Sequence, residues 1–432
     1  MWPLTNQSQD STVSGYQRIK QWSLKRAWRR APLRLLQSWR AEAPVLFKLR
    51  GESYLLCSVS QLQAMLDVDA HAHLERAPAP HSLVNMIPLT EWLPLLQRFM
   101  SVSITPLLEG RDHHSISLLS LTRDPLSWTL AHSLFGVDIR KAHTPRARQV
   151  LSLFEAIEST LQLKHARLTS RETSLWHHRS LRKMYRQMGS PSGLLRHLTA
   201  DQGLRLTYEA LEWRAYIVDT LTWLFVYLEN LPKVRDDVFV EVTEQLESRS
   251  YTPGDLEKTK VLHQISLETL RVAPPHWVTK WGEASALIES ERFARDFGDL
   301  PQHTQLISAP FLDHYEVAEW PSATSFVPHR FLANAHGAPL PTTFLPFGPG
   351  QYGRALLELS MHTIVAVAAS ILRRGFIKIV DSDDDVITSR SSGEAGLSVE
   401  HRCGASFGAP HLEINFEVDE RYIHIPSARV SG

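Results

Sequence analysis

The sequence is poor in cysteine: its 432 residues contain two, Cys57 and Cys403. Two cysteines are too few for a disulfide scaffold, and their separation does not match the spacing of a metal site. An excess of either charge is also lacking, because 46 basic and 46 acidic side chains give a formal net charge of +0. A chain without excess positive charge gives no general electrostatic reason to bind nucleic acid. We therefore expect a globular protein with no metal site and no nucleic-acid partner.

Long uncharged apolar runs are absent as well. Spanning a bilayer takes roughly 20 apolar residues, and the best candidate, Tyr216–Leu228, is shorter and contains Asp219. We therefore expect a cytoplasmic protein without a transmembrane segment. Residues 1–31 form a basic arm in which arginine and lysine alternate with Trp22, Leu24 and Trp28. This pattern predicts a solvated arm, or a weak contact with a membrane surface.

Residues 32–432 predict a single, mostly α (α+β) domain with small β-sheets near its N- and C-terminal parts. Helical periodicity dominates from about Leu130 to Arg271, and a last long helix is expected at 353–374 with Gly375 as its C-cap. Shorter segments are also predicted. They are helices at Pro32–Glu42 and Gln61–Leu66, a hairpin of Val45–Arg50 and Ser53–Val59 about Gly51, and strands at Phe376–Val380 and Leu412–Val418.

The segments HQISLETLRVAPP and ATSFVPHRFL predict a buried ion-pair triad. Glu268 and Arg271 are three residues apart and share a helix face, while Arg330 follows Pro328 in a later loop. A carboxylate between two arginines is satisfied by charge-assisted, bidentate hydrogen bonds. This Glu-x-x-Arg…Arg pattern resembles the structural triad of the haem-thiolate monooxygenases, the cytochrome P-450 superfamily.

The resemblance extends over roughly Pro32 to Gly375. The segment Leu300–Phe326 is similar to the strand and meander of the family, and FLPFGPGQYGRALLELS, Phe344–Ser360, is similar to its haem-binding signature. The resemblance implies a cytochrome P-450-like fold. Its expected parts are a Glu-x-x-Arg helix near 261–271, a meander at 311–345, a haem loop at 344–353 and the last long helix at 353–374.

The haem loop departs from the family pattern, Phe-Gly-x-Gly-x-Arg-x-Cys-x-Gly. Several residues are missing between Gly350 and Gly353, the loop arginine among them, and Gln351 falls where the cysteine belongs. A thiolate ligand pushes electron density onto the iron and favours O–O cleavage, which glutamine cannot do. Tyr352 is the alternative ligand, because tyrosinate also binds haem iron.

Two other segments that serve haem binding or oxygen activation in this family also differ from the family pattern here. Where the resemblance places the oxygen-activating motif Ala/Gly-Gly-x-Asp/Glu-Thr, the chain has Glu212–Tyr216, with bulky Trp213 and with Tyr216 at the alcohol position. The segment EGRDHHSIS resembles the propionate-binding helix: His113 fits, but Ser117 replaces the arginine. The resemblance therefore predicts a degenerate haem site with no cofactor, and haem binding as the alternative.

Without haem, this fold would have an apolar cavity beside the central helix, which we expect Trp213, Gln351 and Tyr352 to line. Glu212 and Tyr216 are four residues apart and share a face. With His113 they are the candidate catalytic residues, because desolvation raises the pKa of a carboxyl toward the range useful for proton transfer. The competing interpretation is that Glu212 forms a structural ion pair.

These expectations favour a haem-independent lyase, isomerase or cyclase of secondary metabolism that acts on an apolar natural product. Two alternatives stay open. The first is a non-catalytic activator of a partner enzyme such as a glycosyltransferase, which a plugged cavity would favour over an open one. The second is a monooxygenase-like haem protein with altered axial ligation.

Overall fold

The computed structural model describes residues 17–18, 44–49, 52–58, 61, 80–109, 116–141, 143–166, 171–188, 192–246, 252–275, 279–283, 295, 299–301, 303–316, 318–348, 350–379 and 413–418. Most of them are helical, which confirms the predicted mostly α (α+β) class. The predicted helix Pro32–Glu42, residues 62–66 of the next one and most of the basic arm lie outside these ranges.

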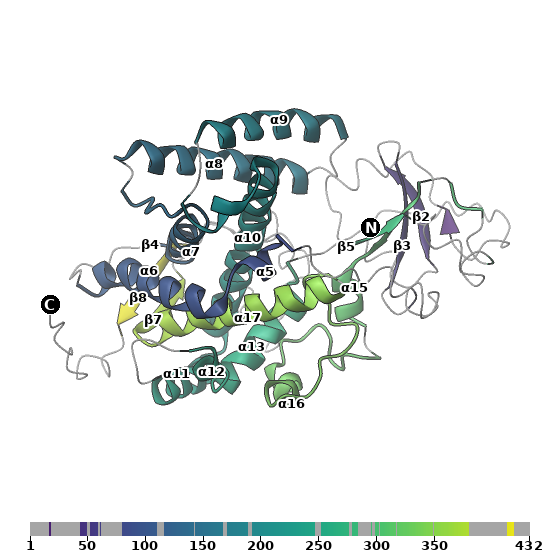
Figure 1. Cartoon of the computed structure of the whole chain (residues 1–432). Helices are drawn as coiled ribbons and strands as arrows, with labels where there is room; N and C mark the ends of the chain where they lie inside the picture. Colours follow the sequence, from purple (N-terminus) through teal and green to yellow (C-terminus); the bar gives the residue numbers. More distant parts are fainter. Residues whose placement is uncertain are drawn as a thin grey trace.

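The helices occupy the middle of the chain and surround one long central helix (Figure 1). Their bounds are α5 Leu83–Met86, α6 Leu89–Glu109, α7 Leu118–Phe135, α8 Pro145–Ala166, α9 Arg171–Gln187, α10 Ala200–Asn230, α11 Pro232–Gln245, α12 Pro253–Leu256, α13 Lys260–Val272, α15 Pro310–His314, α16 Leu332–Ala335 and α17 Gly350–Leu372, with 3₁₀ turns η1 Leu194–His197 and η3 Pro328–Phe331.

Two small sheets flank the helices, as the sequence predicts. The first has the order β1-β2-β3-β6-β5, in which the predicted hairpin appears as β2 and β3 with Leu49 opposite Glu52. The second has the order β4-β8-β7 and joins the C-terminal strands to the start of α7. The bounds are β1 Gln17–Arg18, β2 Val45–Leu49, β3 Glu52–Cys57, β5 Thr279–Glu283, β6 Gln305–Ser308, β4 Ile116–Ser117, β7 Gly375–Ile379 and β8 Glu413–Val418.

Helix α10 is the centre of the fold, with α8 and α9 near one end and α13 and α17 near the other (Figure 1). It begins with a capping box in which Thr199 and Gln202 satisfy each other's backbone N–H groups. It ends at Asn230, two residues before Pro232, which has no N–H to donate and starts α11 instead. Its middle is buried on every side, so any polar side chain there needs a partner or a role.

Helix α17 follows the signature loop and differs from its predicted bounds. It begins at Gly350, three residues before the expected start, and ends at Leu372. Gly348 and Gly350 have φ values of 90° and 79°, so the shortened loop turns directly into the helix through a conformation that glycine adopts readily. Gly375 does not cap the helix but starts β7, opposite Val418.

Among the described helices, α17 is also long and apolar enough to cross a membrane by length and composition. However, 83% of its most apolar window is buried inside the protein, as in the core helix of a globular domain. Its hydrophobicity is therefore accounted for by packing against α6, α10 and α13.

The predicted triad anchors the meander to α13. Arg271 is fully buried, and its five N–H groups all find acceptors. Two go to the Glu268 carboxylate at 2.8 Å, and three go to the backbone carbonyls of His314, Ala323 and Ser325 at 2.8–3.0 Å. Arg330 approaches the same carboxylate at 3.1 Å. The structure thus brings together the three residues that the sequence pairs.

A neutral histidine completes this anchor. The ring of His314 lies between the Arg271 carbonyl, 3.1 Å from Nδ1, and the Leu345 N–H, 3.2 Å from Nε2. Burial, with the adjacent Arg271 charge, lowers its pKa to about 3. The histidine therefore stays uncharged at neutral pH and ties α15 to both α13 and the start of the signature loop.

Candidate functional site

Carboxyl and phenol groups gather where one face of α10 meets the first turn of α17. Four of them, Tyr208, Glu209, Glu212 and Tyr352, are half-buried. Two more, Tyr216 and Asp219, follow along α10 and are buried. We call these six residues the acid–phenol cluster. Positions 209, 212, 216 and 219 repeat every three or four residues, which places them along one helix face.

The outer part of the cluster links three helices. The Tyr352 hydroxyl donates a hydrogen bond to the Glu209 carboxylate, and the backbone N–H of Leu83 in α5 donates to the same group at 3.0 Å. Burial raises the pKa of Glu209, while these two hydrogen bonds offset part of that rise. Glu209 is therefore a fixed carboxyl that holds a proton more readily than a carboxyl in water.

The inner part contains the pair that the sequence predicts. The Tyr216 hydroxyl hydrogen-bonds to Glu212, and burial together with this nearby carboxylate raises the Tyr216 pKa well above its usual value. Tyr216 is thus a neutral phenol that donates a hydrogen bond to Glu212. His113, the third predicted catalytic residue, lies outside the described residues.

Asp219 is the deepest acid of the cluster, with 9% of its surface exposed. It lies close enough to Tyr216 to contribute to the raised pKa of that phenol. No hydrogen-bond or ion-pair partner is assigned to it within the described part of the chain. Burial raises its own pKa well above the usual value, so the neutral acid is the favoured form.

We expect Asp219→Asn to stabilise the protein at neutral pH. The folded-state pKa exceeds that of the unfolded chain, so the folded state binds more protons and stability falls as pH rises above about 4. Asparagine keeps the shape and cannot ionise, so its advantage should grow with pH. Melting curves followed by circular dichroism between about pH 5 and pH 8 measure this. The exposed Asp237→Asn is the matched control, and an unchanged Asp219→Asn profile would contradict the expectation.

Beside the cluster, α10 is held to its neighbours by packing. Trp213 is 1% exposed, its Nε1–H donates to Ser360 of α17 at 2.9 Å, and its ring packs 5.4 Å from that of Trp92. Trp92 in turn donates to Thr363 of α17 at 3.0 Å. These side chains fill space between α6, α10 and α17. Trp213, predicted to line a cavity, is therefore part of the core.

Arg214 points away from the cluster, as expected from its place on the helix. Its guanidinium is 4% exposed and contacts Glu158 of α8 at 2.5 Å and Ser127 of α7 at 2.7 Å. The cluster therefore receives no counter-charge from this arginine. Of the other predicted cavity residues, Gln351 is exposed on the first turn of α17, whereas Tyr352 belongs to the cluster.

Three cluster members were not singled out by the sequence: Tyr208, Glu209 and Asp219. A usable signal existed for the two acids, because they extend the Glu212–Tyr216 face by one turn in each direction on a largely apolar helix. The contact of Glu209 with Tyr352 joins positions 143 residues apart, and nothing local encodes it.

The comparisons with known proteins agree with this fold. Residues 218–373 match the family model described as Cytochrome P-450. Over 171 residues the chain is 24% identical to pentalenene oxygenase of Streptomyces avermitilis, covering 39% of this chain and 36% of that protein. Over 154 residues it is 30% identical to cyclooctat-9-en-7-ol 5-monooxygenase of Streptomyces melanosporofaciens, covering 35% and 32%.

A plant protein matches to a similar extent: beta-amyrin 28-monooxygenase of Medicago truncatula is 28% identical over 155 residues, 33% of this chain and 30% of that protein. The matched segments thus span about a third of each relative's length. The helical fold, the triad with its meander and these matches agree on a cytochrome P-450-like fold. The chain resembles the cytochrome P-450 superfamily, and residues 218–373 carry the match to its family model.

The described residues do not fit a thiolate-ligated haem, the cofactor of this superfamily. Cys57 is buried in β3, paired with β6, and burial raises the pKa of its thiol. Cys403 lies outside the described residues. Burial and the Glu209 carboxylate raise the pKa of Tyr352, which keeps it a phenol instead of the tyrosinate that binds iron. No group of three His, Cys, Asp or Glu within the described ranges is arranged to hold a metal ion.

We expect the purified protein to carry no stoichiometric haem. It should also lack the red-shifted band of a carbon monoxide complex of reduced thiolate-ligated haem, because the loop offers no thiolate. An absorption spectrum of protein produced in haem-supplemented cells measures both. A strong Soret band at one haem per chain would contradict the expectation.

Proposed function

We propose that this chain is a haem-independent enzyme with a cytochrome P-450 fold that moves protons on an apolar, terpenoid-like natural product. The observation that carries the proposal is the acid–phenol cluster on the face of α10 that meets α17. Hydrogen bonds from Tyr352 to Glu209 and from Tyr216 to Glu212 fix the orientation of its carboxyls and phenols. Burial raises the pKa values of two of these carboxyls, Glu209 and Asp219, toward the range in which a general acid holds its proton.

The expected chemistry is cyclisation, isomerisation or elimination. Glu212 transfers the proton and Tyr216 assists by holding and polarising the carboxyl. In an isomerisation or cyclisation, a proton added at one alkene carbon is balanced by loss of a proton from another carbon. In an elimination, a proton added to a hydroxyl group leaves with it as water, and a neighbouring carbon loses a proton. The printed names of the relatives support an apolar substrate, since pentalenene and beta-amyrin are terpenoids.

Two alternatives have support of their own. The filling of space by Trp213 and Trp92 favours a non-catalytic activator of a partner enzyme, such as a glycosyltransferase. The names of the relatives, which are oxygenases and monooxygenases, favour oxidation with an altered haem ligand.

The mass of the product separates these functions. Haem-free protein is incubated with terpenoid alkenes and alcohols without a reductant, and products are identified by mass spectrometry. An isomer of the substrate, or a product lighter by one water, supports proton transfer. A product heavier by one oxygen, formed only with haem and reductant, contradicts it. No product, together with activation of a co-purified transferase, would favour the activator.

A further inference from the structure

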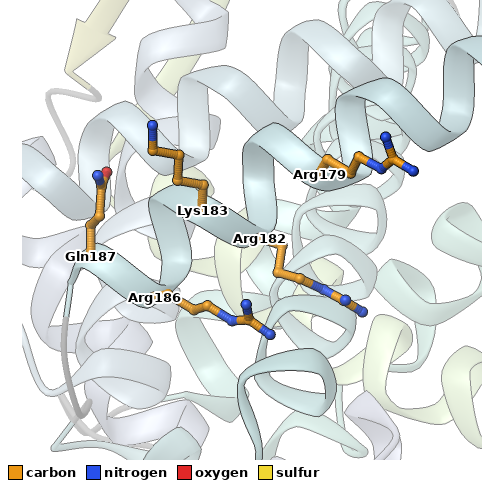
Figure 2. A pocket seen from close by; sticks show the side chains of 5 residues that line it. All are labelled: Arg179, Arg182, Lys183, Arg186 and Gln187. Carbon is orange, nitrogen blue, oxygen red and sulfur yellow. The ribbon is translucent and has the colours of Figure 1, made fainter.

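Helix α9 carries a stripe of positive charge on its outward face. Arg179, Arg182, Lys183 and Arg186 recur at the spacing of one helix face and, with Gln187, line a shallow hollow of about 400 Å³ (Figure 2). We call these four cations the α9 stripe. In the whole molecule α9 lies at the edge, beyond α8 and one end of α10 (Figure 1), and Arg179, Lys183 and Arg186 are exposed.

The inward face of α9 fixes this orientation. Leu181 and Tyr185 are buried, and the Tyr185 side chain packs against Gly203 of α10, where a larger residue would clash with it. Arg182 reaches Asp201 at the start of α10 and forms an ion pair of 2.7 Å. The helix is thus anchored by apolar contacts and one ion pair, and its remaining charges are presented to solvent.

The other three cations of the α9 stripe differ from Arg182 in this respect. Within the described residues, Arg179, Lys183 and Arg186 have no assigned hydrogen bond or ion pair. Like charges three and four residues apart on a helix repel one another and destabilise it. The chain as a whole has no net charge, so the stripe does not reflect a generally basic surface. A locally unfavourable feature of this kind is a sign of a binding function.

We propose that the α9 stripe is a docking surface for the acidic face of another protein. A complementary row of carboxylates would relieve the repulsion and speed association. The charged ends of the four side chains spread along the helix (Figure 2), which suits an extended acidic surface better than one small anion held by converging donors.

Two other classes of partner fit less well. Over residues 179–187, whose side chains the structure describes, Leu181 and Tyr185 are buried and the exposed residues are all polar or charged, which favours no insertion into a membrane. The neutral net charge of the chain gives none of the broad positive field typical of nucleic-acid binding.

The test measures binding of a fluorescein-labelled helical peptide with glutamates spaced to match the stripe, by fluorescence anisotropy with the full chain. The stripe variant carries Arg179→Glu, Lys183→Glu and Arg186→Glu. The matched control carries the same change in net charge at dispersed, exposed positions: Lys48→Glu, Lys141→Glu and Lys233→Glu. Melting curves verify that both fold. Duplex DNA and phosphatidylserine vesicles serve as competing probes.

We expect the wild type to bind the peptide, with an affinity that falls as salt increases. The stripe variant should bind at least about tenfold more weakly, whereas the dispersed control should bind like the wild type. Equal loss in both variants, or no binding at low salt, would overturn the proposal. Tighter binding of the stripe to DNA or to vesicles than to the peptide would also overturn it, in favour of that class.

Discussion

Replacing Glu268 with alanine is expected to lower the free energy of unfolding by about 3–5 kcal/mol, because it leaves the buried Arg271 charge without its carboxylate. Glu268 and Arg271 are both fully buried, and Glu268 also accepts the backbone N–H of Val327 at 2.7 Å. Loss of the carboxylate therefore releases the meander as well as the charge. Arg330→Ala should act in the same direction, since it removes the second cation from the same carboxylate.

Urea denaturation followed by circular dichroism measures this effect. Glu257→Ala is the control, because its side chain is 64% exposed and such surface changes alter stability by less than about 0.5 kcal/mol. A Glu268→Ala protein as stable as the wild type would show that the triad does not hold the fold together.

Replacing Glu212 with glutamine is expected to reduce turnover by about 10²-fold or more, with little change in stability or ligand affinity. Glutamine preserves the volume and can still accept the hydrogen bond of Tyr216, but it cannot transfer a proton. Tyr216→Phe should reduce turnover less, because the phenol assists the transfer instead of carrying it.

The measurement is the initial rate of product formation in the assay described for the proposed function. Glu244→Gln, at an exposed position of α11, is the matched control and should turn over normally. Full activity in Glu212→Gln would remove this residue from the mechanism. Full activation of a partner enzyme by the same variant would favour the activator function.

The sequence predicts the parts of the fold that depend on strong local chemistry. Glu268, Arg271 and Arg330 are identifiable because buried charges require partners, and Pro232 marks the end of α10 for a local reason. Helices α6 and α7 do not stand out in the same way. Their sequences contain proline at positions 94, 106 and 125, which normally interrupts helices. Packing of their apolar faces against the core overrides this preference.

The sequence predicts the site residues that share one face of α10. It does not predict the residue that a second helix, α17, contributes. The spacing of Glu212 and Tyr216 places them on one face, and the structure brings them into contact. The contribution of Tyr352 depends on the shortened loop that starts α17 at Gly350, a change of backbone path that residue spacing does not reveal. Site residues that come from a second element therefore need the tertiary structure.

The hydrogen bonds that join α10 to α17, from Trp213 to Ser360 and from Tyr352 to Glu209, have a consequence for the cell that makes this protein. Stability gained from a bound ligand varies with the ligand's free concentration. Bonds between side chains of one chain carry no such dependence, so this junction forms as soon as the chain folds. The stability that these two hydrogen bonds give the junction therefore does not vary with the supply of any small molecule in the host.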